Sequence, residues 1–384
     1  MSEHPTPYQK HQSFVEIRQR KALHDILPRI QTLADHLDKS RLDDKAKAIV
    51  RQACTEILKG SESDDLKEAF KLYPNVIEEV DRLTDAELPQ YMWYRFRYEI
   101  FPQRKLLDHF PPLLQIEPTS ICNYRCIFCY QTDMEFTDKA KGQMGSMSLD
   151  LFKKLIDQTQ GNAEAVTLAS RGEPLICRDI EGMLAYIRGK FLALKMNTNA
   201  SLLDEKKCHA ILQAGIQTLV ISADAAAEPA YSQFRVNGKL DRVVANVKML
   251  RDIRLKQYPQ SRMITRVSGV QVPGTPNLDE MEAFWGELVD QVAFVKYNPW
   301  EDTYLQPIND IQDACSDLWR RMFVWWDGTV NPCDVDYKSA LKVGTATEKP
   351  LTDLWQSESY QTLRQKHLAR QRSSCDPCQR CTVI

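Results

Sequence analysis

Cys122-Asn-Tyr-Arg-Cys126-Ile-Phe-Cys129 is the stretch of this chain that decides its fold and its chemistry. It directly follows a largely apolar run, 113–119, that reads as a short strand. Three thiolates at this spacing can bind one face of a [4Fe–4S] cluster, which normally takes four cysteine ligands. One iron is then open to another ligand, which suggests chemistry rather than scaffolding. A zinc knuckle lacking its fourth ligand, or a chance grouping of reduced cysteines, are the alternatives.

The composition is that of an ordinary globular protein with one large domain and appendages, with 384 residues, 43% hydrophobic residues and a net charge of −2. The balanced charge predicts no particular partner. No apolar run approaches membrane-spanning length, and the polar start Met1-Ser-Glu-His-Pro5 does not resemble a signal peptide, so we expect a cytoplasmic protein. Eight of the eleven cysteines fall into two groups at metal-ligand spacing, which favours a reducing compartment over disulfides.

From about residue 111, short β-rich runs alternate with helical segments. The expected strands cover the ranges 112–118, 164–169, 192–197, 217–222, 263–270 and 292–297. Six such β/α units predict an α/β fold, a partial (β/α)6 TIM-like barrel over residues 111–305. In barrels of this kind the chemistry gathers at the carboxyl ends of the strands, and the cysteine loop follows the first strand.

Residues 1–110 predict an all-helical N-terminal extension. Helical patterns cover the ranges 15–37, 45–58 and 66–83. The stretch 91–101 interleaves aromatic residues with Arg95 and Arg97, a pattern that could bind nucleic acid by stacking and charge. Because the overall charge is balanced, we favour a helix that packs its aromatic residues on the barrel, and we expect neither a nucleic-acid partner nor a membrane.

The C-x3-C-x2-C spacing after a strand resembles the radical S-adenosylmethionine (radical SAM) superfamily. In that family the methionyl amine and carboxylate chelate the open iron, and one electron from the cluster cleaves the sulfonium to a 5′-deoxyadenosyl radical. The resemblance implies a [4Fe–4S] cluster bound to S-adenosylmethionine and a reductant such as flavodoxin or ferredoxin. It also implies that Phe128, directly before the third cysteine, lies near the adenine.

Two further segments resemble cofactor-binding elements of the family. Arg171-Gly-Glu-Pro174 follows the second strand and is similar to the family's Gly-Gly-Glu-Pro segment, with arginine in place of the first glycine. The resemblance implies that Gly172 and Glu173 bind the methionyl amine; the alternative is an ordinary turn. Asn197-Thr-Asn199 ends the third strand and is similar to the family's Thr-Asn-Gly element, which makes Asn199 a cofactor contact.

The ends of the later strands carry polar candidates as well. Ser222 is placed to hydrogen-bond ribose or carboxylate oxygens, and Asp224 to cap a helix or contact substrate. Arg235 resembles a family arginine that pairs with the cofactor carboxylate, a task that suits a planar guanidinium. Gly269 lies in a segment similar to the family's adenine-contacting strand. For the polar residues, turns and helix caps are the alternative roles.

The loop Tyr297-Asn-Pro-Trp-Glu-Asp-Thr-Tyr304 follows the sixth strand and is dense in acids and aromatic residues. We take it as the best candidate for substrate contact, with Glu301 as a candidate catalytic residue beside Asp224. The alternative is a solvated connector anchored by its tryptophan.

The last segment, 306–384, holds the second group of cysteines. Cys315 precedes an expected β-hairpin with an Asp-Gly turn, Cys333 follows it, and the chain ends in Cys375-Asp-Pro-Cys378-Gln-Arg-Cys381. This arrangement resembles the SPASM and twitch extensions of radical SAM enzymes. Five cysteines, against the seven of a full SPASM set, imply one auxiliary [4Fe–4S] cluster. The implied ligands are Cys315, Cys333, Cys378 and Cys381, with Cys375 spare or an alternative ligand; a zinc site is the other interpretation.

An auxiliary cluster can receive an electron, so the resemblance implies a radical SAM enzyme that oxidises a sugar or aminocyclitol alcohol. If Cys375 is unligated near the radical, its thiol could return a hydrogen atom, and the outcome would be epimerisation. The alternatives are modification of a peptide or protein by a SPASM-type maturase, and a non-catalytic Fe–S electron-transfer or scaffold protein.

Overall fold

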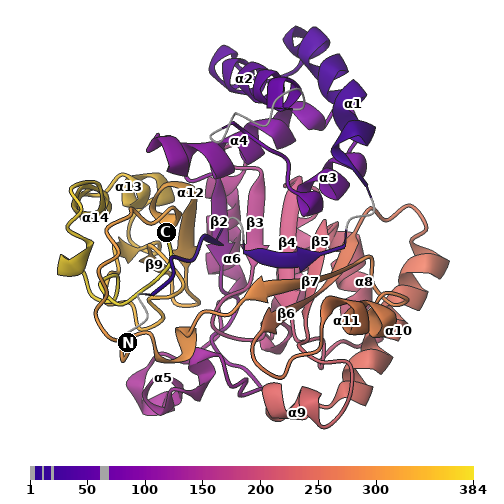
Figure 1. Cartoon of the computed structure of the whole chain (residues 1–384), viewed down its shortest axis with the longest axis vertical. Helices are drawn as coiled ribbons and strands as arrows, with labels where there is room; N and C mark the ends of the chain where they lie inside the picture. Colours follow the sequence, from indigo (N-terminus) through magenta and orange to yellow (C-terminus); the bar gives the residue numbers. More distant parts are fainter. Residues whose placement is uncertain (1–4, 11–12, 19–20, 61–68) are drawn as a thin grey trace.

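The computed structural model describes residues 5–10, 13–18, 21–60 and 69–384. Within these residues, one sheet holds ten strands in the order β1-β7-β6-β5-β4-β3-β2-β8-β9-β10 (Figure 1). The strands are β1 (Phe14–Ile17), β2 (Leu113–Ile116), β3 (Ala165–Leu168), β4 (Ala193–Thr198), β5 (Thr218–Ser222), β6 (Ile264–Gln271), β7 (Gln291–Lys296), β8 (Arg321–Val324), β9 (Thr329–Asn331) and β10 (Gly344–Thr345).

Strands β2 to β7 pair in parallel and in sequence order, which confirms the expected α/β fold with a partial barrel. Their side chains alternate between two environments, as the two-residue period of a strand requires. Met196, Leu219 and Val267 belong to the apolar core. Lys195 and Arg266, one residue away from members of that core, line a cavity inside the barrel. The barrel interior is therefore polar, while the outer face of the sheet is apolar.

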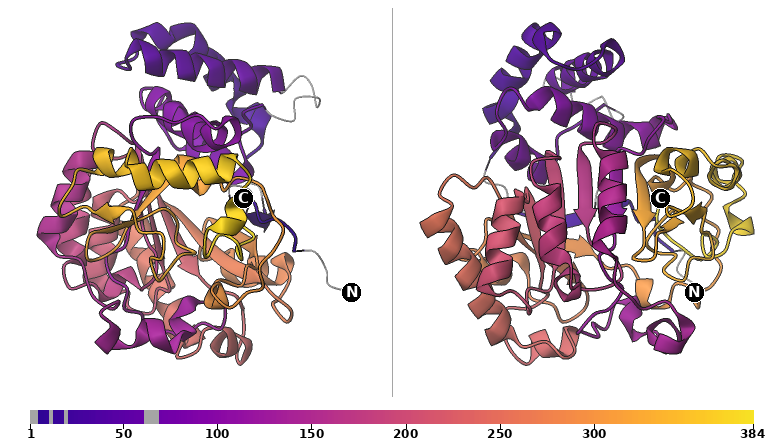
Figure 2. Two further views of the ribbon diagram at one scale, coloured as in Figure 1. Left: turned by 90° about the vertical axis from the view of Figure 1, so that its left-hand side faces the viewer. Right: turned by 180° about the vertical axis from the view of Figure 1, so that it is seen from behind.

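Helices cover the outer face of the sheet, as the views from the side and from behind show (Figure 2). The helices of the barrel are α5 (Met134–Thr137), α6 (Leu149–Thr159), α7 (Ile180–Ile187), α8 (Glu205–Ala214), α9 (Ala230–Phe234), α10 (Leu240–Gln257) and α11 (Leu278–Trp285). Buried residues of these helices, such as Phe152 and Trp285, share one core with the outward-facing strand residues. None of the helices in the described part of the chain is long and apolar enough to span a membrane.

Four helices precede the barrel and pack at the amino ends of its strands, opposite the cysteine loop (Figure 1). They are α1 (Leu23–His36), α2 (Asp44–Gly60), α3 (Pro74–Asp81) and α4 (Leu88–Arg104). Helix α4 is buried along most of its length, and its Arg95 and Arg97 form ion pairs with Glu99 (2.6 Å) and Asp108 (2.9 Å). The aromatic stretch is thus packed inside the protein, as we favoured.

The prediction of a purely helical N-terminal extension is wrong at its start. Residues Val15 to Ile17 belong to strand β1, which pairs antiparallel with β7, and helix α1 begins only at Leu23. Aromatic and β-branched residues favour a strand here, and the pairing covers an edge of β7 that would otherwise be open. Of the expected helix over 66–83, residues 66–68 lie outside the described residues, and α3 begins at Pro74.

The C-terminal segment continues the same sheet. Strand β8 pairs in parallel with β2, and β9 and β10 follow antiparallel. The turn between β8 and β9 contains Gly328 at φ 89°, which confirms the expected Asp-Gly hairpin. Helices α12 (Asp317–Arg320), α13 (Leu351–Trp355) and α14 (Glu358–Leu368) complete this segment. The sheet runs across the boundary we placed at 305/306, which stays a prediction.

Candidate active site

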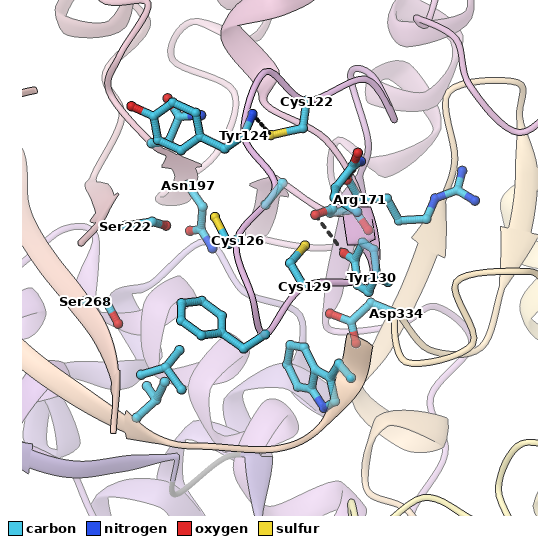
Figure 3. Close-up of a pocket in the computed structure, with 18 of the residues that line it drawn as sticks. Cys122, Tyr124, Cys126, Cys129, Tyr130, Arg171, Asn197, Ser222, Ser268 and Asp334 are labelled. Carbon is cyan, nitrogen blue, oxygen red and sulfur yellow. Dashed lines mark hydrogen bonds between the residues drawn. The ribbon is translucent and has the colours of Figure 1, made fainter. Parts of the chain in front are cut away.

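A cavity of about 320 Å³ lies at the carboxyl ends of the barrel strands. Cys122, Cys126 and Cys129 line it from the loop after β2, and side chains from later strands face them (Figure 3). These later residues include Asn197 of β4, Asn199 directly after β4, Ser222 at the end of β5, and Ser268 and Val270 of β6. The parallel strands thus bring to one place most of the residues that the sequence indicated separately.

The cysteine loop is held in place by hydrogen bonds from the protein around it. Backbone N–H groups of Arg125 and Ile127 donate to the carbonyls of Val236 (3.0 Å) and Phe234 (3.2 Å). The Tyr124 N–H donates to the Cys122 Sγ at 3.4 Å, and Arg235 Nη1 donates to the Cys126 Sγ at 3.4 Å. Donors that point at sulfur stabilise the thiolate form, which is the form that binds iron.

Cys126 is buried and Cys122 and Cys129 are half-buried. Loss of contact with water raises the pKa of Cys122 to about 12. The thiols are therefore protonated until a metal replaces the proton. Among the described residues, no three His, Cys, Asp or Glu side chains are grouped closely enough to hold a single metal ion. A [4Fe–4S] cluster is larger, and each of its cysteines binds a different iron. Three soft sulfur donors around one cavity, with a guanidinium beside them, fit that group.

Gly172 and Glu173 lie where the sequence placed them, on the wall of the cavity. A Cβ atom on Gly172 would lie 2.3 Å from the carbonyl oxygen of Thr119 and 2.5 Å from that of Ile121, so this close approach of two loops requires glycine. The Glu173 carboxylate accepts hydrogen bonds from Thr198 Oγ1 (2.6 Å), and also from the N–H groups of Asn199 (2.7 Å) and Leu175 (3.1 Å). Burial nevertheless raises the pKa of Glu173.

Arg171, where the family motif has glycine, has its own partners away from the thiols (Figure 3). Its guanidinium forms a bidentate pair with the fully buried Glu117, with Nε–Oε2 2.7 Å and Nη2–Oε1 2.6 Å. Its Nη1 donates to the Tyr337 carbonyl at 2.9 Å, and the guanidinium carbon lies 4.2 Å from the ring centre of Trp325. This one side chain therefore ties the cofactor-side loop to the C-terminal segment.

Arg235 lines the cavity. The Phe128 ring lies against the Arg235 side chain, with 5.0 Å between the guanidinium carbon and the ring centre. Asp224 does not line the cavity. It is fully buried and accepts hydrogen bonds from Arg235 Nε and from the Val270 N–H (2.7 Å). Burial alone would lower the pKa of Arg235, but Asp224 and Cys126 raise it above its usual value. Asp224 therefore orients the Arg235 guanidinium and stabilises its charged form. This role corrects the catalytic role that we expected for Asp224.

The other two catalytic candidates also lie outside the cavity lining, so these expectations are corrected too. Glu301 accepts a hydrogen bond from Tyr297, whereas Tyr297, Asn298 and Trp300 of the same loop do line the cavity. Cys375 is buried in the apolar core of the barrel and the C-terminal segment. Gly269, the expected adenine contact, does not line the cavity either. It packs against Phe294, and its neighbours Ser268 and Val270 face the cavity instead.

The second group of cysteines comes together in the C-terminal segment. Burial first, then the Asp336 carboxylate, and then the neighbouring thiols of Cys378, Cys315 and Cys381 raise the pKa of Cys333 well above its usual value. The loop that carries Cys378 and Cys381 is held by Arg372, whose Nε and Nη2 donate to their carbonyl oxygens at 3.0 and 2.5 Å. Four half-buried thiols with one another as neighbours fit a four-cysteine cluster.

Two cavity residues had no signal in the sequence. Tyr8 reaches the cavity from the N-terminal segment, which is joined to the chain's end by bonds from the Tyr8 N–H to Thr382 O (2.8 Å) and from the Ile384 N–H to Tyr8 O (2.9 Å). Tyr130 donates its hydroxyl to the Ser170 carbonyl at 2.9 Å and stacks on Tyr337 with ring centres 4.9 Å apart. Only the folded chain brings these distant segments together.

Comparison with known proteins matches both cysteine segments. The model of the radical SAM superfamily matches residues 116–269, and that of the SPASM iron–sulfur cluster-binding domain matches residues 315–382. The AdoMet-dependent heme synthase of Methanosarcina barkeri is 28% identical over 142 residues, which cover 37% of this chain and 39% of that protein. The first listed relatives are thus matched over about two fifths of their length or less.

A longer match is the S-adenosyl-L-methionine-dependent 2-deoxy-scyllo-inosamine dehydrogenase of Niallia circulans. It is 21% identical over 283 residues, which cover 72% of this chain and 95% of that protein. Among solved structures, Streptococcus suis SuiB bound to S-adenosylmethionine superposes with a TM-score of 0.50 at 16% identity. That alignment covers 89% of this chain and 88% of SuiB, and it shows a shared fold.

Proposed function

Because this chain belongs to the radical SAM superfamily and carries a C-terminal SPASM domain, we propose that it dehydrogenates an alcohol carbon of a small sugar or aminocyclitol. Cys122, Cys126 and Cys129 would hold the cluster that binds S-adenosylmethionine. Cys315, Cys333, Cys378 and Cys381 would hold the auxiliary cluster. When bound, these groups supply a hydrogen-abstracting 5′-deoxyadenosyl radical and an electron acceptor, so the alcohol carbon loses a hydrogen atom, and a proton and an electron leave with it.

We choose oxidation over epimerisation because of where Cys375 lies. An epimerase needs a group near the radical that returns a hydrogen atom. The cysteines among the described residues that line the cavity are the three of the loop after β2. Cys375, the candidate donor, is buried in the apolar core instead. The relative from Niallia circulans, a dehydrogenase matched over nearly its whole length, supports the same choice.

The residues of the chain would bind and orient the cofactor. Glu173 would accept a hydrogen bond from the methionyl ammonium, and Arg235 would donate to the methionyl carboxylate. Both are charge-assisted hydrogen bonds, which contribute roughly 1.5 to 3 kcal/mol each. Asp224 fixes the direction of the Arg235 guanidinium through Nε. Burial of these groups excludes water, which strengthens each interaction.

Product analysis tests the proposal. Protein reconstituted anaerobically with iron and sulfide is incubated with S-adenosylmethionine, a reductant and a panel of sugars and aminocyclitols. We expect 5′-deoxyadenosine together with a product that lacks two hydrogen atoms of its substrate. A variant Cys333→Ala should lose that product, while Cys54→Ala, a lone buried thiol in α2, should keep it. A product of unchanged mass with an inverted carbon would contradict the proposal.

A further inference from the structure

A second cavity, of about 310 Å³, lies inside the barrel and adjoins the one that the thiols line, with which it shares part of its wall. Tyr8, Asn197, Ser268 and Asp334 line both cavities. The inner cavity extends to the amino ends of the strands, where residues of α3 and α4, such as Glu79 and Arg95, also line it. The inner cavity is therefore next to the place where the cofactor would bind.

The inner cavity has more cations than carboxylates along its wall. The cations are Lys10, Arg95, Lys195, Arg266 and Arg321, and the carboxylates are Glu79, Glu99 and Asp334. Three of the cations are compensated: Lys10 by Asp317 (2.9 Å) and Asp334, Arg95 by Glu99 (2.6 Å), and Arg321 by Asp317 (3.7 Å) and the Tyr98 hydroxyl. Lys195 and Arg266 therefore account for the excess of positive charge.

The side chain of Lys195, half-buried on β4, makes no hydrogen bond or ion pair with any residue that the structure describes. Arg266, on β6, is only 2% exposed. Its Nε donates to Gln291 Oε1 at 2.6 Å. Its buried Nη2 has no hydrogen-bond partner in the described part of the chain, and the nearest carboxylate oxygen, Oε1 of Glu79, is 3.9 Å away. A buried guanidinium nitrogen without an acceptor is costly unless something supplies one.

The sheet register brings these two cations to the same wall. Lys195 pairs with Thr218 of β5, and Val220 of β5 pairs with Arg266, so one strand separates them and both face the interior. Burial, and then the charges of Arg266 and Arg321, lower the pKa of Lys195 to about 7. Burial also lowers the pKa of Arg266. Burial is the main cause of both shifts, and the carboxylates of Glu79 and Glu78 oppose the shift of Arg266 only in part.

We infer that Lys195 and Arg266 bind a carboxylate group of the substrate inside the barrel. The substrate class is then an alcohol that also carries a carboxylate, such as a sugar acid. That this molecule is the substrate rests on the proposed function, whereas the anion site does not. Two cations beside Glu79 leave one positive charge uncompensated, which matches a monoanion better than a phosphate dianion. The planar guanidinium also matches the geometry of a carboxylate.

Anion binding at this site must depend on pH through Lys195. The charged groups that face it are Arg266 on β6, Arg321 on β8, Glu79 on α3 and Arg95 on α4. An anion favours the protonated amine, so binding raises the pKa of Lys195. Below the pKa of the free protein the amine is already charged. As the pH rises above about 7, binding must take up a proton, and the affinity falls by up to about tenfold per pH unit.

Acetate is the probe, because it carries the carboxylate and little else. Binding of 13C-labelled acetate is measured by NMR relaxation on the full-length reconstituted protein with S-adenosylmethionine and without reductant, at constant ionic strength. We expect saturable binding that weakens above about pH 7. Lys195→Met should bind roughly tenfold more weakly and lose the pH dependence. Lys154→Met, the same change at an exposed lysine of α6 outside the lining of this cavity, should bind as the parent does.

Arg266→Gln should weaken acetate binding to a similar degree, with its thermal melting recorded to show that it is folded. Lys195→Met removes a half-buried, unpaired charge and should fold, so it keeps the test decisive if Arg266→Gln does not. Absence of saturable acetate binding in the parent, or unchanged binding in Lys195→Met, would overturn the site. Tighter binding of phosphate than of acetate would overturn the carboxylate. Acetate binding without any oxidised product would contradict the proposed function alone.

Discussion

Replacing Arg171 with methionine should destabilise the protein by about 3 to 4 kcal/mol. Arg171 is 4% exposed and Glu117 is fully buried, and removing one partner of such a pair leaves an uncompensated charge, at a cost of about 3 to 5 kcal/mol. The lower end applies because Glu117 keeps two backbone donors, the N–H groups of residue 171 (3.1 Å) and Trp326 (3.3 Å). The Tyr337 carbonyl also loses a donor, which adds about 1 kcal/mol.

Urea unfolding followed by tryptophan fluorescence measures this cost. Arg171→Met, Glu117→Gln and the double variant complete a double-mutant cycle, which isolates the coupling between the two side chains. The double variant should be more stable than Arg171→Met alone, since no buried charge remains. Arg380→Met, a partly exposed arginine in an i,i+4 pair with Asp376, is the control and should cost less than about 1 kcal/mol. A cost below about 1 kcal/mol for Arg171→Met, or simple additivity in the cycle, would refute the reasoning.

Two further predictions concern cofactor binding by the reconstituted protein, measured by equilibrium dialysis with labelled S-adenosylmethionine. Arg235→Met should weaken binding by roughly ten- to a hundredfold. Asp224→Asn should weaken binding less and leave the iron content unchanged. Equal binding by Arg235→Met and the parent would contradict the contact between Arg235 and the methionyl carboxylate. Gly172→Ala should abolish binding because its Cβ would overlap the carbonyls of Thr119 and Ile121, and retained affinity would show that this close approach of loops is dispensable.

The parallel strands and the grouping of the first three cysteines at one strand end could be predicted because their signals are local. Each barrel strand is a short β-rich run, and the three cysteines of the first loop are close in sequence. Strand β1 could not be predicted in this way, because Phe14–Ile17 becomes a strand only by pairing with β7, nearly three hundred residues later. Tyr8 likewise reaches the cavity only through its bonds to the end of the chain.

The roles of polar residues at the strand ends were the least predictable part of the site. In the sequence, Asp224 and Arg235 both looked like contacts to cofactor or substrate. Only the structure shows that the Asp224 carboxylate accepts hydrogen bonds from Arg235 and from the Val270 N–H instead. The interior of the barrel reverses the usual pattern, since Lys195 faces inward and Met196 faces the helices. Alternation along a strand indicates two faces, but not which of them is turned toward a cavity.

The most direct test of the account is the iron content of the triple variant Cys122→Ala, Cys126→Ala, Cys129→Ala, together with its cleavage of S-adenosylmethionine. The account predicts a loss of about four irons per chain and of all 5′-deoxyadenosine, while the auxiliary cluster remains. Cys375→Ala, the matched control from the second group, should keep the irons of both clusters and its cleavage activity. Unchanged cleavage by the triple variant would contradict the claim that these three thiols hold the catalytic cluster.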